Sequence, residues 1–246
     1  IWYVIVLYGL CSIVFHLYFM DLTMGDDPYY TEVLRDITMK EFLVKRWTKW
    51  SSRLLMEIAC AWIIPLPAWI WMGLDVVASM VLAYALLGMF YHKKTAAYSI
   101  AFAGGLLFLY DFRDMNTAGW MTTTIFYWWA LVTGFVAFIP IYLDYKKETV
   151  KPWMYVWAIL CSIYAANLEV VTIAFVCTSI YMLTLYKWEG RKAPKYLYYL
   201  LTLGVTWVVI VLICPGNDVR KIANTEFWFP NYANFNLIQK GLLGWY

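Results

Sequence analysis

Two acidic side chains that could act as a general base follow the first apolar run of the chain. Asp26 and Asp27 stand directly after Gly25, and the apolar run covers 1–20. A carboxylate beside apolar surface can have a raised pKa, which suits proton abstraction from a hydroxyl group. The pair is therefore a candidate base for a sugar or lipid hydroxyl, or a candidate metal ligand. Two solvated loop acids are an equally simple interpretation.

Charged and amide side chains also stand between later apolar runs, where they could bind an anionic group. Arg53 and Glu57 lie four residues apart and so share one helical face, which is typical of a structural ion pair. Arginine can also bind a phosphate in bidentate fashion through its planar guanidinium. Glu169 is flanked by apolar residues, where an unpaired acid is costly. The candidate ligands for a phosphate or sugar are Arg53, Glu57, Arg113, Asn116, Trp120, Asn167, Glu169, Asn217 and Arg220.

Several of these candidates have a structural interpretation as well. Arg113 stands between Asp111 and Asp114 and could form an ion pair with either of them. The tripeptide 215–217, Pro-Gly-Asn, has the composition of a turn that ends a helix. Trp120 fits an aromatic belt at a membrane interface more simply than it fits a platform for a sugar ring.

Two ionisable side chains fall inside apolar runs. Asp75 lies in the run over 68–91, so we expect it near mid-depth or paired with another helix. His16 has no partner at metal-binding spacing and is interpreted as a core residue with satisfied hydrogen bonds. The sequence carries no P-loop, GxGxxG, HExxH or GxSxG motif. A divalent metal ion at the acidic pair is the one cofactor that the sequence leaves open.

The composition is that of a membrane protein. Of the 246 residues, 63% are hydrophobic and only 14% are charged, against about 25% charged in soluble domains. These values exclude a disordered chain and a nucleic-acid binder with a broad basic face. The net charge of +3 is too small to indicate a polyanionic partner. A spanning helix needs about 20 apolar residues, so the length allows about seven spans.

The positions of the apolar runs predict an all-α, polytopic transmembrane bundle of about seven spans. The third and fifth runs are short for a complete crossing of the bilayer. The whole chain, 1–246, is predicted to be one transmembrane module with an outer loop over 21–67. The runs cover 1–20, 68–91, 95–110, 120–143, 153–166, 170–187 and 196–214.

The segment 21–67 is predicted to carry helices on the membrane surface. Between 31 and 47, apolar residues recur among charges at the spacing of an amphipathic surface helix. A second helical stretch over 51–64 is followed by Pro65 and Pro67, which predict the start of the next span.

The distribution of Lys and Arg predicts the orientation. The short links 92–94, 144–151 and 187–195 carry nine Lys/Arg and three Asp/Glu. Short loops rich in Lys and Arg face the cytoplasm. The N-terminus is therefore predicted to be cytoplasmic, and the connections that carry the candidate site residues are predicted to face outward.

Short motifs along most of the chain resemble the GT-C class of polytopic glycosyltransferases, which use polyprenyl-phosphate-linked sugars. The segment 25–30, Gly-Asp-Asp-Pro-Tyr-Tyr, is similar to the acidic motif that this class carries in its first outer loop. Other segments are similar to a bacterial family of uncharacterised GT-C-like membrane proteins. They are Ser52-Arg53-Leu54 with Glu57, Asn-Thr-Ala-Gly-Trp-Met-Thr-Thr-Thr at 116–124, Ala-Asn-Leu-Glu at 166–169, and Cys-Pro-Gly-Asn-Asp-Val-Arg at 214–220.

The resemblance implies transfer of a sugar from a polyprenyl-phosphate carrier to an extracytoplasmic glycan or lipid acceptor. It implies that Asp26 or Asp27 is catalytic, and that Arg53, Arg113 or Arg220 contacts the lipid phosphate. It also implies a bacterial plasma membrane, an active site on the outer face, and further spans after this module, so the chain is expected to be the N-terminal part of a longer protein.

Two other classes of function remain as alternatives. A transporter or flippase for a lipid or small solute would use Glu169 and Asp75 as acids inside the membrane. A non-catalytic subunit of a membrane complex would use the same acids only in ion pairs.

Overall fold

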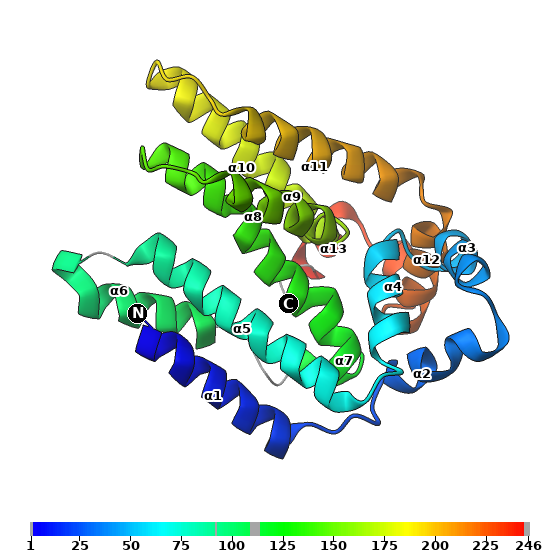
Figure 1. Cartoon of the computed structure of the whole chain (residues 1–246). Coiled ribbons are helices and arrows are strands. Elements are labelled where there is room, and N and C mark those ends of the chain that lie inside the picture. The colour runs from blue at the N-terminus through cyan, green and yellow to red at the C-terminus, as the bar shows by residue number, and fades with distance from the viewer. Residues whose placement is uncertain (1, 92, 109–113, 244–246) are drawn as a thin grey trace.

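The structure is a computed structural model that describes residues 2–91, 93–108 and 114–243 (Figure 1). Within these ranges all regular structure is helical and there is no β-strand. The prediction of an all-α fold is therefore confirmed.

Apolar helices that lie side by side form the bulk of the molecule (Figure 1). Each of the seven predicted apolar runs coincides with one of them, and the ends differ from the prediction by a few residues, except that α8 starts nine residues after the start of the run 120–143. The helices are α1 (Trp2–Phe19), α5 (Ala68–Phe90), α6 (Ala96–Phe108), α8 (Trp129–Tyr145), α9 (Pro152–Ala165), α10 (Glu169–Trp188) and α11 (Lys195–Ile213). At its start, α8 is continuous with α7 (Trp120–Thr123) and with a π-helical turn, η3 (Thr124–Trp128).

In the described part of the chain, five helical segments are long and apolar enough to cross a membrane, and they fit an integral membrane protein. They are α1, α5, the continuous helix over Trp120–Tyr145, α10 and α11. The helices α6 and α9 have 13 and 14 residues, which is fewer than the roughly 17 that a crossing requires. The count of seven spans therefore stays a prediction.

More polar helices gather at one end of the bundle, on the right in Figure 1. The predicted surface stretch over 31–47 is two helices rather than one. It breaks at Thr38, which forms a capping box: the Thr38 hydroxyl accepts from the Glu41 backbone N–H, and the Glu41 carboxylate accepts from the Thr38 N–H. The helices at this end are the more polar α2 (Asp27–Asp36), α3 (Met39–Lys49) and α12 (Pro215–Trp228) together with the apolar α4 (Leu54–Ile63), and a short helix, α13 (Leu237–Leu243), follows α12.

The apolar face of α3 packs on the protein. Phe42 is fully buried and belongs to the same core as Met56 and Cys60 of α4. Val44 of the same helix is 55% exposed, and contact of these helices with a membrane surface stays a prediction. The prolines at 65 and 67 directly precede α5, as predicted.

The basic links lie together at the opposite end of the bundle. Figure 1 shows the N-terminus and the connections after α5, α8 and α10 at the left end of the apolar helices, away from α2, α3 and α4. The basic links and the helices α2, α3 and α4 therefore lie at opposite ends of the bundle, as the sequence predicts. Which end faces the cytoplasm stays a prediction.

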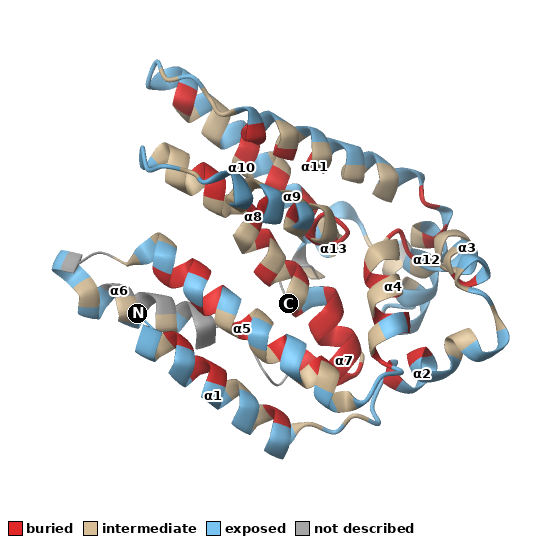
Figure 2. Cartoon of the chain, viewed as in Figure 1, coloured by how far each residue is buried: buried red, intermediate tan, exposed pale blue. Residues whose placement is uncertain are grey.

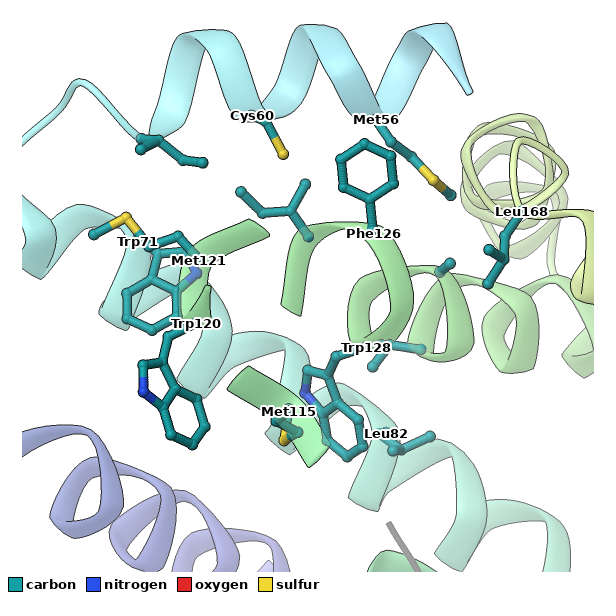
Figure 3. Close-up of a cluster of buried hydrophobic side chains, with 14 of the residues drawn as sticks. Met56, Cys60, Trp71, Leu82, Met115, Trp120, Met121, Phe126, Trp128 and Leu168 are labelled. Atoms are coloured by element: carbon teal, nitrogen blue, oxygen red, sulfur yellow. The ribbon is translucent and has the colours of Figure 1, made fainter. Parts of the chain in front are cut away.

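Buried indoles join α5 to the helix that begins at Trp120. Trp71 donates its indole N–H to the Thr124 hydroxyl (2.9 Å), and Trp128 donates to the Ser79 hydroxyl (3.3 Å). Adjacent residues of a regular α-helix point about 100° apart, and the wider π-helical turn lets Trp128 and Trp129 both reach α5. Figure 2 shows the buried residues along these facing surfaces, and Figure 3 shows the indoles of Trp71, Trp120 and Trp128 within the core.

We expect Trp71→Phe to lower the free energy of unfolding by about 2 kcal/mol, because it removes a buried hydrogen bond and leaves a small cavity. Trp69→Phe is the matched control, since Trp69 lies on the same helix and is 71% exposed. Unfolding of the purified protein in mixed micelles measures both variants. Equal effects of the two substitutions would contradict the role of the Trp71–Thr124 hydrogen bond.

Candidate functional site

The loop that carries the acidic pair is seated on the backbone just before α7. The Asp26 backbone N–H donates to the Ala118 carbonyl oxygen (2.8 Å). Gly25 and Gly119 have positive φ angles of 61° and 95°, which favour glycine. A Cβ atom on Gly25 would lie 2.3 Å from the Ala118 carbonyl carbon. The backbone segments around 25 and 118 are therefore in direct contact, although they are far apart in the sequence.

Asp27 anchors the first turn of α7. Its side chain accepts the backbone N–H groups of Met121 (3.1 Å) and Thr122 (2.9 Å), and the Thr122 hydroxyl (2.7 Å). The residue is only 2% exposed. Burial raises the pKa of Asp27, and the hydrogen bonds from Thr122 and Met121 partly offset this effect. Its carboxylate is thus already occupied in satisfying the unpaired N–H groups of a helix start.

Asp26 has a different environment although it is the adjacent residue. It is exposed at the protein surface. The surrounding protein nevertheless removes part of its hydration, which raises the pKa of its carboxyl group, and the positive charge of Arg46 partly offsets this effect. Of the two acids, Asp26 is the one whose carboxylate a substrate could reach. The sequence alone leaves the two acids equivalent.

Glu57 pairs with a residue that the sequence analysis did not select. Arg46 of α3 lies 2.7 Å from a Glu57 carboxylate oxygen, and the Tyr30 hydroxyl donates to the other oxygen (2.6 Å). Glu57 is completely buried. The expected Arg53–Glu57 ion pair is therefore wrong, because Glu57 points into the contact between α2, α3 and α4 while Arg53 stands before the first turn of α4.

An aromatic cage surrounds Arg46. Its guanidinium lies within 6 Å of four aromatic ring centres, and it also donates to the Tyr30 hydroxyl (3.1 Å). Cation–π contacts of this kind stabilise a desolvated guanidinium. Arg46 and Glu57 stand eleven positions apart on two different helices, so spacing along the sequence does not pair them, but an arginine close to Trp47 and Trp50 was a usable signal. The rings belong to Tyr29, Tyr30, Phe42 and Trp50.

Glu169 binds two arginines. Arg53 donates to it through Nε (2.8 and 3.1 Å) and places Nη2 2.7 Å from the carboxylate, while Nη2 of Arg220 lies 3.3 Å away. Arg53 also donates to the Tyr127 hydroxyl (3.3 Å). The three charged side chains are 13–22% exposed. We call Arg53, Glu169 and Arg220 the arginine cluster; it carries two positive charges and one negative charge, so it retains a net positive charge.

The positive charges in the arginine cluster affect one another. Burial and the neighbouring Arg53 lower the pKa of Arg220, although the Glu169 carboxylate opposes them. Burial also acts to lower the pKa of Arg53, but Glu169 outweighs it and leaves that pKa raised. Both guanidinium groups stay charged near neutral pH, because arginine is not deprotonated in proteins. An anion that approached Arg220 would relieve the repulsion between the two cations.

The amides of Asn167 and Asn217 hold the backbone next to Arg53. The Asn167 side-chain oxygen accepts from the Leu55 N–H, and that of Asn217 accepts from the Ser52 N–H, both at 3.2 Å. Asn217 also donates to the Ser52 hydroxyl (3.0 Å). These two amides position the arginine cluster and are themselves occupied by structural hydrogen bonds.

The segment 215–217 begins a helix and does not form a turn that ends one. The preceding helix ends at Ile213, and Pro215 is the first residue of α12. Proline suits this place because the first helical N–H has no partner within the helix. A Cβ atom on Gly216 would lie 2.5 Å from the Trp50 backbone nitrogen. This close approach seats α12 on α3 and brings Arg220 to Glu169.

The remaining predicted site residues lie apart from these contacts. Trp120 is buried and packs edge-on against Phe15, with ring centres 5.6 Å apart, so it is a core residue and not an exposed platform. Asn116 lies in a 3₁₀ turn, where its carbonyl accepts from the Gly119 N–H (3.0 Å). Arg113 falls outside the described residues.

One short helix connects the acidic pair with the arginine cluster. Arg53 stands immediately before α4, and Glu57 lies in its first turn. Burial raises the pKa of the Cys60 thiol, and the nearby carboxylates of Glu57 and Asp27 raise that pKa further. A helix of ten residues is about 15 Å long. The acidic pair and the arginine cluster therefore share one end of the molecule without touching.

Two cavities lie elsewhere in the bundle. One of about 150 Å³ lies between α1, α5 and the Trp120–Tyr145 helix, and a groove of about 770 Å³ lies between α5, α8 and α9. None of the predicted site residues lines either space. Within the described part of the chain, no three His, Cys, Asp or Glu side chains gather in a way that could hold a metal ion.

Comparison with protein-family models, with curated proteins and with solved structures gives no match to this chain.

We expect Gly25→Ala to be far more damaging than Gly190→Ala. Both glycines have φ angles near +60°, but a Cβ atom has open space at Gly190 and clashes with backbone at Gly25. The positive φ alone costs about 1 kcal/mol in both variants. Any further loss of unfolding free energy in Gly25→Ala therefore measures the close contact between the two loops. Unfolding of both variants in mixed micelles gives the comparison. Similar stabilities would contradict the close contact between Gly25 and Ala118.

Proposed function

We propose that the chain is the catalytic module of a membrane glycosyltransferase of the GT-C type. It would transfer a sugar from a polyprenyl-phosphate carrier to a glycan or lipid acceptor on the outer face of a bacterial plasma membrane. The observation that carries this proposal is the presence of an accessible carboxylate of raised pKa, Asp26, at the same end of an apolar bundle as a net positive arginine cluster.

The base in this proposal is Asp26. Its carboxylate would accept the proton of the acceptor hydroxyl while the hydroxyl oxygen attacks the anomeric carbon and the lipid phosphate leaves. A raised pKa brings a carboxylate closer to the working pH and makes it a stronger base. Asp27 supports the same reaction indirectly, because its hydrogen bonds to Met121 and Thr122 fix the loop that carries Asp26.

The phosphate of the carrier would bind at the arginine cluster. Glu169 satisfies only part of the donor capacity of the two guanidinium groups, and the side chains are partly open to solvent. Arginine binds phosphate oxygens in bidentate fashion. The phosphate would lie near Arg53 and Arg220, and the acceptor hydroxyl would attack from the opposite side of the same anomeric carbon.

The lipid tail of the carrier needs apolar surface at membrane depth. The groove between α5, α8 and α9 is lined almost entirely by apolar side chains, including Val77, Val81, Val136 and Trp157. Such a surface can receive part of a hydrocarbon chain. It lies on the same apolar bundle whose end carries the arginine cluster.

We expect Asp26→Asn to reduce sugar transfer from a polyprenyl-phosphate donor by about 100-fold or more, the range for loss of a general base. Among the described residues the exposed Asp26 side chain makes no hydrogen bond, and it does not cap α2, so the free energy of unfolding should be unchanged. Transfer of radiolabelled sugar by the protein in nanodiscs gives the activity. Full activity of Asp26→Asn would remove the proposed base.

Asp27→Asn is the informative comparison for the same assay. An asparagine would direct N–H donors at the backbone N–H groups of Met121 or Thr122, so we expect lower stability together with lower activity. Loss of activity with unchanged stability in Asp27→Asn alone would move the base from Asp26 to Asp27.

We expect Arg220→Gln to raise the KM for the lipid-phosphate donor about 10-fold or more, because one charge-assisted contact to phosphate is lost. Lys221→Gln on the same helix removes the same charge from an exposed position and should leave KM unchanged. Steady-state kinetics over a range of donor concentrations separates the two variants. An equal effect of both substitutions would indicate a general charge effect and not a phosphate site.

A further inference from the structure

A histidine and an aspartate meet inside the bundle, away from the acidic pair and the arginine cluster. His16 of α1 places Nε2 3.1 Å from Oδ2 of Asp75 on α5, and both side chains are only 3% exposed. Asp75 is seven residues into α5, about 10 Å from its start. The sequence predicts that Asp75 lies near mid-depth or pairs with another helix, and the structure shows the pairing.

The hydrogen-bond partner of Nδ1, the other nitrogen of the His16 ring, determines which ring nitrogen carries a hydrogen atom. Nδ1 of His16 lies 2.6 Å from the Ser12 carbonyl oxygen, whereas the Ser12 hydroxyl oxygen is 3.5 Å from Nδ1, which is beyond the usual range for an O–H donor. A carbonyl oxygen only accepts hydrogen bonds, so Nδ1 must carry a hydrogen atom. A neutral imidazole with its hydrogen on Nδ1 has a bare lone pair on Nε2, the nitrogen that faces Asp75.

The contact between Nε2 and Asp75 therefore requires one more proton. A bare Nε2 and an ionised carboxylate are both acceptors and cannot form a hydrogen bond with each other. A proton between them gives either an imidazolium with a carboxylate or an imidazole with a carboxylic acid. Either form has no net charge, which suits a position among apolar helices, whereas loss of the proton would leave a buried negative charge.

The other polar contacts of Asp75 agree with this arrangement. The indole N–H of Trp129 donates to Oδ1 of Asp75 (2.7 Å), so Oδ2 is the oxygen left for His16. Among the described residues that line the adjacent cavity, the other titratable groups are Tyr8 and Cys11, which are uncharged at neutral pH in their ordinary state. Neither of them can neutralise an Asp75 carboxylate.

We propose that His16 and Asp75 together form a proton-binding site inside the helix bundle, which holds one shared proton. The cavity of about 150 Å³ borders this pair and is also lined by Ser12 and Ser79. The site joins α1 to α5, and through Trp129 it joins the wall of the groove between α5, α8 and α9. The proposal is independent of glycosyl transfer.

Nitrogen-15 NMR of the histidine rings tests the proton directly. The chain has two histidines, His16 and His92, so His92→Gln leaves one labelled ring. At about pH 8 a histidine in water is neutral. The proposal requires either two protonated ring nitrogens, or a ring protonated on Nδ1 together with an infrared band of a protonated carboxyl group that disappears in Asp75→Asn. A neutral ring protonated on Nε2, or one protonated on Nδ1 without the carboxyl band, would overturn it.

A pair of substitutions tests the same proton through stability. In Asp75→Asn the amide N–H can donate to Nε2 while the amide oxygen accepts from Trp129, so this variant reproduces the protonated pair without a proton. We expect its unfolding equilibrium constant to stay within a few-fold of the original. His16→Gln leaves a buried carboxylate without its partner and should raise that constant about 100-fold or more.

The double variant His16→Gln/Asp75→Asn completes the test, because it removes the uncompensated charge and should recover most of the stability that His16→Gln loses. The proposal would be overturned if Asp75→Asn were as damaging as His16→Gln. A double variant no more stable than His16→Gln alone would overturn it as well.

Discussion

The structure depends on one electrostatic constraint: an ionised side chain carried into an apolar helix bundle must find partners there. Glu57 is fully buried and is compensated by Arg46 and Tyr30. Glu169 is compensated by two arginines, and Asp75 is held by an imidazole and an indole. Because a buried unpaired charge costs several kcal/mol, these contacts fix which helices can lie side by side.

The same constraint explains the arrangement at the polar end of the bundle. The helices α2, α3 and α12 are amphipathic and α4 is short and apolar, and all four pack on the bundle through buried charged and amide groups. Two asparagines bind the backbone before α4, and a glycine lets α12 approach α3 closely. The result is a rigid layer in which Asp26 is exposed while the neighbouring carboxylate of Asp27 is not. A difference in chemical role between two adjacent acids thus arises from packing.

The helices themselves were largely predictable from the sequence. Apolar runs of 13 residues or more are local features, and each of the predicted runs contains a helix with nearly the same ends. Local capping signals were available too, and the Thr38–Glu41 capping box that divides 31–47 is one that the hydrophobic pattern alone did not reveal. The number of crossings was less accessible, because α6 and α9 are short and length alone does not decide whether such helices span.

What the sequence by itself determined is therefore the class of fold, the place of each apolar helix and the set of ionisable residues that needed partners. Only the tertiary structure decided who those partners are. Arg53 binds Glu169, 116 residues away, and not the nearby Glu57, while His16 meets Asp75 across 59 residues. The physical reason is that hydrophobic periodicity and capping act within a few turns of a helix, whereas a buried charge is neutralised by whichever group the packing of distant helices brings to it.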